Sequence, residues 1–112
     1  MTGMFLILSF PPTPMKYLTL KAQEIPLDDP KSRYLFSTDE NKQFLISRAA
    51  MERFGCKTIF GCLMWLQGMA QIQDGLDTLQ VFEPRDGGEA LWLIDEGDAP
   101  EGAVKAMLPS DD

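Results

Sequence analysis

The sequence contains no histidine, which removes the side chain that most often serves as a general base or a metal ligand. It also lacks the Gly-x-Ser-x-Gly elbow, the Walker loop and the Gly-x-Gly-x-x-Gly fingerprint. These motifs carry nucleophilic catalysis, phosphate binding and dinucleotide binding. We therefore expect no enzymatic activity, no catalytic residue and no cofactor.

Cysteine is scarce: the chain has Cys56 and Cys62, which are six positions apart. This spacing is not a Cys-x-x-Cys pair, and a structural zinc site would need carboxylates in place of histidine, which is unusual. Both cysteines lie in an apolar stretch, so we expect two buried free thiols and no metal. Free thiols favour a reducing compartment, the cytoplasm.

A hydrophobic run long enough to cross a bilayer is also missing. Residues 1–10 are apolar but too short for a membrane span, and they lack the basic start of a signal peptide. Pro11, Pro12 and Pro14 follow where a cleavage site would need small residues. Residues 1–14 are either an edge strand or an extension upstream of a start at Met15, and we expect no membrane association.

Basic residues are rare in the second half of the chain. Residues 1–57 hold eight basic and six acidic side chains, whereas residues 58–112 hold two basic and eleven acidic side chains. An acidic half repels phosphate groups, so direct binding to nucleic acid or to an anionic membrane is unfavourable. The charge serves either solubility or attraction of a basic partner.

The remaining composition is that of an ordinary globular domain. The chain has 112 residues, of which 45% are hydrophobic and 24% charged, and this length fits one domain. We assign residues 15–108 to a single domain and residues 109–112 to a frayed acidic tail.

Several short segments have the pattern of β-strands. Residues 16–23 alternate between polar and apolar, and residues 25–30, with two prolines and two aspartates, predict a loop. Residues 33–37 and 43–46 flank a polar turn and predict a β-hairpin. A second hairpin is predicted over residues 78–94, around Asp86-Gly87-Gly88, and residues 103–108 predict a last strand, with a short helix as the alternative.

Two helices are predicted between these strands. Ser47 is a suitable N-cap for a helix over residues 48–54, and Gly55 is suited to an αL C-cap. Residues 57–73 have helical periodicity and are apolar almost all round in their first half, and Gly68 either lies within this helix or breaks it. The predicted fold class is α+β, with a mainly antiparallel sheet from two hairpins packed on one or two central helices.

Two features point to a binding surface. Four carboxylates lie on a glycine-bearing loop, but their spacing matches no EF-hand, so a solvated or partner-binding loop is expected rather than a metal site. Trp92 lies in residues 91–94, an apolar run without alternation, which indicates burial on both faces or a face exposed for a partner. The predicted contact residues are Asp86, Asp95, Glu96, Asp98, Glu101 and Trp92.

The sequence therefore predicts a small cytoplasmic, non-enzymatic binding or regulatory module that acts through protein–protein contact. Its acidic surface would meet a basic patch, even a nucleic-acid-binding groove, as an inhibitor or adaptor of the mobile-element type. One alternative is a structural homodimer formed through the apolar helix or a sheet edge around Trp92. Another is a small ligand or metal binder that relies on carboxylates.

Overall fold

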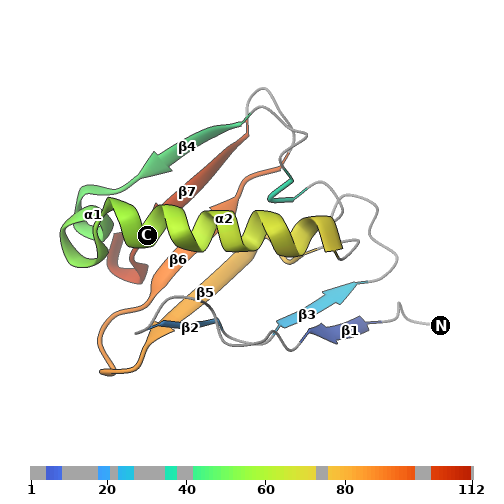
Figure 1. The fold of residues 1–112 in the computed structure, drawn as a ribbon, viewed down its shortest axis with the longest axis horizontal. Helices are drawn as coiled ribbons and strands as arrows, with labels where there is room; N and C mark the ends of the chain where they lie inside the picture. The colour runs from blue at the N-terminus through green and yellow to red at the C-terminus, as the bar shows by residue number, and fades with distance from the viewer. Residues whose placement is uncertain are drawn as a thin grey trace.

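The computed structural model describes residues 5–8, 18–20, 23–26, 35–37, 42–72, 76–97 and 102–111. Within these ranges a five-stranded sheet is crossed on one face by a long helix (Figure 1). The elements in chain order are β1 (Phe5–Leu8), β2 (Leu18–Leu20), β3 (Gln23–Pro26), β4 (Gln43–Ile46), α1 (Arg48–Phe54), α2 (Cys56–Ile72), β5 (Leu79–Pro84), β6 (Leu91–Asp95), β7 (Ala103–Met107) and the 3₁₀ turn η2 (Pro109–Asp111).

The main sheet has the strand order β2-β5-β6-β7-β4 and is antiparallel except for the pair β4–β7. Strands β5, β6 and β7 follow one another as a meander, so the predicted hairpin over residues 78–94 and the predicted last strand are confirmed. Helix α2 carries the chain from β4 at one edge across to β5 beside β2 (Figure 1). The α+β class and the mainly antiparallel sheet are thus as predicted.

The predicted hairpin over residues 33–46 is wrong for the residues that the structure describes. Leu35 and Phe36 lie in a turn, and β4 pairs in parallel with β7, with Phe44 opposite Val104. Phe36 has a φ of 58° and its side chain is buried in the core. The apolar residues of this segment therefore fill the core from a turn and do not extend the sheet.

A second, two-stranded sheet is formed by β1 and β3, which pair antiparallel. Residues 5–8 are thus a strand, although not one added to the main sheet. Ile25 and Pro26 lie in β3, so the loop predicted there is wrong for these two positions, because β1 supplies a pairing partner. Residues 27–30 lie outside the described part of the chain.

Helix α1 forms with the predicted N-cap, whereas the αL conformation predicted for Gly55 is wrong. The Ser47 hydroxyl accepts a hydrogen bond from the Ala50 N–H at 3.0 Å, and the Gly55 N–H donates to the Met51 carbonyl. Gly55 has a φ of 82° but a ψ of 154°, which lies outside the αL region, and the chain passes directly into α2. Helix α2 continues without a break past Gly68.

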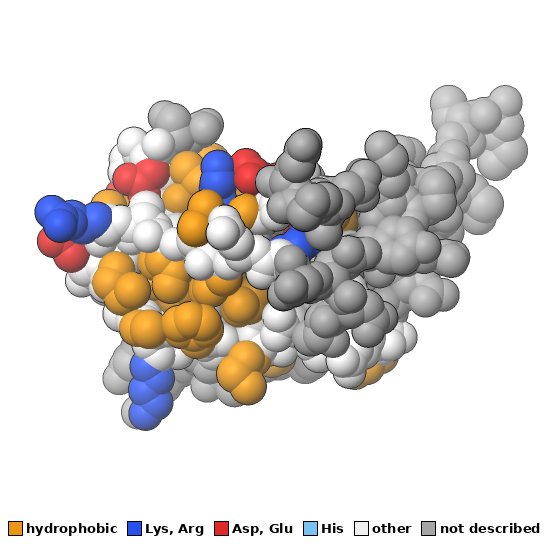
Figure 2. Space-filling model, turned by 90° about the horizontal axis from the view of Figure 1, so that it is seen from above, with side chains coloured by type: hydrophobic (Ala, Val, Ile, Leu, Met, Phe, Trp, Pro, Cys, Tyr) orange, Lys and Arg blue, Asp and Glu red, His pale blue; other side chains and the backbone are white. Residues whose placement is uncertain are grey.

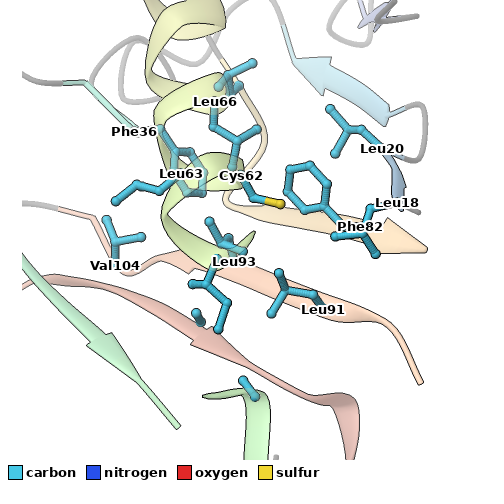
Figure 3. Packing of buried hydrophobic residues seen from close by; sticks show 14 of the residues in the cluster. Leu18, Leu20, Phe36, Cys62, Leu63, Leu66, Phe82, Leu91, Leu93 and Val104 are labelled. Carbon is cyan, nitrogen blue, oxygen red and sulfur yellow. The ribbon is translucent and has the colours of Figure 1, made fainter. Parts of the chain in front are cut away.

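The core lies between α2 and the sheet face beneath it (Figure 3). Ile59, Cys62, Leu63 and Leu66 form the buried side of α2, and they recur at the helical period. They pack with fully buried side chains of β5 and β6: Phe82, Leu91 and Leu93. Burying one such aliphatic or aromatic side chain contributes about 1.5–3 kcal/mol.

The chain end at residues 109–111 is not frayed, which corrects the prediction for this segment. The Asp111 carboxylate accepts hydrogen bonds from the Ser47 hydroxyl at 2.7 Å and from the Leu108 N–H at 2.9 Å. The Ser110 N–H donates to the Glu89 carboxylate at 2.7 Å. The Leu108 and Ser47 hydrogen bonds lower the pKa of the Asp111 carboxyl, because both favour its charged form.

Candidate contact surface

Side chains alternate along each strand between the two faces of the main sheet, and the two faces differ in burial. Leu91, Leu93 and Asp95 of β6 are buried on the side of α2, whereas Trp92 and Ile94 are only partly buried and point to the opposite side. We call this opposite side the outer face. The unbroken apolar run that contains Trp92 thus supplies both the core and the outer face.

The outer face carries apolar side chains on three strands, with one charged side chain, Lys105, opposite Ile94. Trp92 is paired with Val81 on one side and with Met107 on the other, and Ile94 is paired with Leu79. All five side chains are partly exposed. Antiparallel sheets that pack one face on helices usually present polar residues on the other, so this apolar face is unusual and is suited to a contact.

Asp95 does not lie on a surface, and its assignment as a partner-binding residue is therefore wrong. Its carboxylate is fully buried and accepts hydrogen bonds from the Phe36 N–H at 2.7 Å and from the Gly97 N–H at 2.8 Å. The Lys42 ammonium lies 2.8 Å and 2.9 Å from its two oxygens. These donors offset the cost of removing the carboxylate from water.

The polar turn predicted between residues 37 and 43 implies an exposed Lys42, whereas its side chain is buried in the ion pair with Asp95. A signal for the buried pair does exist in the sequence, since Asp95 continues the alternation of Leu91 and Leu93 on the core side of β6. A charge at such a position needs a buried partner, although the sequence does not say which of the ten basic side chains provides it.

The remaining predicted acidic residues do not form one surface. Glu96 is exposed at the end of β6 and lies 2.9 Å from the Lys105 ammonium. Asp86 is exposed in the β5–β6 turn, at the other end of β6, where it lies 3.7 Å from Arg53 and accepts a hydrogen bond from the Gly88 N–H. Asp98 and Glu101 lie outside the described residues.

The two cysteines differ in their surroundings. Cys62 is buried as predicted, and desolvation raises the pKa of its thiol to about 12. Cys56 is exposed as the first residue of α2, so its predicted burial is wrong. Both are free thiols.

The described ranges show no group of three or more side chains that could hold a metal ion. Over the same ranges, no helix combines the length and the apolar character that crossing a membrane requires.

Helix α2 presents a second apolar surface, on the side that faces away from the sheet. Its seventeen residues include one charged side chain, Lys57. Phe60, Met64 and Ile72 are 42%, 67% and 77% exposed, respectively. Figure 2, which views the molecule from above Figure 1, shows hydrophobic side chains gathered on the side of the helices.

Comparison of the chain with protein-family models, curated proteins and solved structures found no match.

Proposed function

We propose that this chain is a non-enzymatic binding module that acts by contact with another protein through the outer face of its main sheet. The observation that carries this proposal is the position of Trp92. It lies on the middle strand of the sheet, between Val81 and Met107, on the face turned away from the helices. Tryptophan and methionine are enriched at protein interfaces, and binding energy concentrates in central aromatic residues.

The charges at the margin of the outer face favour a basic partner. Glu83 is exposed on β5 and alternates with the buried Phe82, so it lies on the outer face. Glu96 and Lys105 lie near the other end of this face and pair with each other. The chain as a whole carries a net charge of −7. A partner with an apolar patch and basic residues around it would gain from both features.

The setting proposed for this module is the reducing cytoplasm. Cys56 and Cys62 are both free, and Cys56 is exposed to solvent. An exposed free thiol persists more readily where glutathione and thioredoxin keep cysteines reduced.

Capture from a cell lysate by wild-type and variant chains tests the proposal. Trp92→Ala and Ile94→Lys alter the outer face, and Met51→Ala is the matched control because it removes an exposed apolar side chain from α1, outside this face. A protein that is retained by wild type and by the control, but lost with both outer-face variants, supports the proposal. If every captured protein is retained equally by all folded variants, the outer face is not the contact surface. Circular dichroism and a thermal melt establish which variants are folded.

A further inference from the structure

Apolar residues and a glycine recur at a fixed spacing on the outward side of α2. Phe60, Met64, Gly68 and Ile72 follow one another at intervals of four residues, so they form one ridge along the helix. All four are exposed. Solvent-facing helix surfaces are normally polar, whereas this ridge has no polar side chain and is accompanied by one cation, Lys57.

Among the described residues, no contact requires a glycine at position 68. Its backbone is helical, and no atom of those residues lies within 4 Å of the point where a Cβ atom would be placed. A glycine inside a helix costs about 1 kcal/mol relative to alanine. Its missing side chain leaves a depression in the ridge, one turn beyond Met64, whose side chain is 67% exposed.

We propose that a second copy of this chain packs antiparallel on this ridge, with Met64 of each subunit seated over Gly68 of the other. If position 64 faces position 68, the two-fold axis passes at the level of Leu66. The same symmetry then brings Phe60 of one subunit against Ile72 of the other. Met64 of each subunit thus fills the depression at Gly68 of the other, and Phe60 packs against Ile72. Each contact occurs twice, as a closed two-fold interface requires.

Charge also selects the antiparallel arrangement. Lys57 lies in the first turn of α2, and antiparallel packing places it near the C-terminal end of the partner helix. The carbonyl groups at that end carry partial negative charge, and Asp77 follows shortly after it in the chain. Parallel packing would instead bring the two Lys57 side chains together.

The helical side is also where two acidic chains can approach each other most easily. The chain carries a net charge of −7, but α1 and α2 together hold three basic side chains and one acidic side chain: Arg48, Arg53, Lys57 and Glu52. Contact through the helices therefore joins parts of the two subunits that carry little negative charge.

The size of the surface predicts a weak dimer. Stable interfaces bury roughly 800 Å² on each partner. Such an interface has roughly 20–30 residues on each side, whereas the ridge has four, Phe60, Met64, Gly68 and Ile72. We expect a dissociation constant on the order of 10–100 µM, equivalent to about −5.5 to −7 kcal/mol.

Light scattering on a sizing column, from micromolar to millimolar chain, tests the dimer. Met64→Lys places a charge at the centre of the ridge, and Leu45→Lys is the matched control, since it makes the same replacement at an exposed apolar residue of β4. We expect wild type and the control to dimerise with rising concentration, and Met64→Lys to remain monomeric. A monomeric wild type at millimolar concentration, or a dimer that Leu45→Lys disrupts and Met64→Lys does not, overturns the proposal.

Disulfide trapping tests the orientation in a Cys56→Ser background, with the buried Cys62 retained. Met64→Cys and Gly68→Cys chains, mixed, should cross-link to each other faster than Met64→Cys chains cross-link among themselves. Equal rates, or no cross-link, would rule out the proposed register. The test uses purified protein and a surface other than the outer face, so its outcome is independent of whether Trp92 binds a partner.

Discussion

Two ion pairs in this molecule have carboxylates that are neighbours in the sequence. Lys42 lies 2.8 Å from Asp95, and Lys105 lies 2.9 Å from Glu96. The side chains of the first pair are 5% and 0% exposed, and those of the second are 43% and 40% exposed. Since the distances are nearly equal, the pairs differ in their access to water, and this access determines what each contributes to stability.

The buried pair joins segments that are distant in the chain. Asp95 is hydrogen-bonded to Phe36, and Phe36 and Lys42 are 59 and 53 residues away from it in sequence. Removing one partner leaves an uncompensated charge in the interior. Removing one partner of the exposed pair leaves a charge that water solvates. The first pair therefore fixes the fold, whereas the second remains available at the surface.

The largest expected effect is that of Asp95→Ala. It leaves the Lys42 ammonium and two backbone N–H groups without their acceptor, and we expect a loss of about 3–5 kcal/mol in the free energy of unfolding. Urea denaturation followed by circular dichroism measures this loss. A loss below about 1 kcal/mol would show that the buried pair is energetically equivalent to an exposed one.

A double-mutant cycle sharpens the comparison. Lys42→Met and Asp95→Asn should each destabilise the chain strongly, and the double variant should lose less than the sum of the two, because neither charge is then left buried alone. We expect a coupling energy of about 1–3 kcal/mol in the same urea measurement. Strict additivity would mean that the two side chains do not act as a pair.

A hydrogen bond at the surface can still stabilise the chain where it satisfies a backbone N–H group. The Ser47 hydroxyl accepts the Ala50 N–H of α1 and donates to Asp111, so Ser47→Ala removes a helix cap and a link to η2. We expect a loss of about 1 kcal/mol, in the range of other N-cap removals. Ser110→Ala, at the neighbouring exposed position, is the control and should leave the unfolding midpoint nearly unchanged.

The titration of Asp111 reports the same contact. Because its pKa is lowered in the folded state, its contribution to stability is present at neutral pH and is lost as the pH falls through that lowered pKa. Two-dimensional NMR should find the Asp111 carboxyl titrating below the usual aspartate range. In Ser47→Ala the pKa should rise toward that range, since one of the two hydrogen bonds to the charged form is gone. An unchanged titration would show that the serine does not hold this carboxylate.

The smallest expected effect is that of Glu96→Ala. Exposed pairs contribute about 0–1 kcal/mol, and salt screens them. The unfolding free energy should change by less than about 1 kcal/mol, and the change should shrink further at high salt. A change as large as that of Asp95→Ala would remove the distinction between the two pairs.

The elements that could be predicted from the sequence are those whose determinants lie close together in the chain. Ser47 and Gly55 define the ends of α1 through contacts within four residues. The periodicity of Ile59, Leu63 and Leu66 identifies the buried side of α2, and Gly87 and Gly88 identify the β5–β6 turn. Each of these signals depends on backbone geometry or on local hydrogen bonds.

The positions that could not be predicted depend on partners far away in the chain. Residues 35–36 and 43–46 look like the two strands of a hairpin, but β4 has a better partner in β7, some sixty residues later. Asp95 looks like part of an acidic loop, but its environment is set by Lys42 and Phe36. The exposure of Cys56 and Met64 likewise depends on which side of α2 meets the sheet.

The sequence by itself thus determined the fold class, both helices, the N-cap of α1 and the hairpin of β5 and β6, because these follow from periodicity and local hydrogen bonding. The tertiary structure alone decided the place of β4 at the sheet edge, the burial of Asp95 against Lys42 and the exposure of Trp92 on the outer face. Burial and strand pairing are set by contacts between segments that any one stretch of sequence does not contain. The same carboxylate therefore belongs to the core at position 95 and to the surface at position 96.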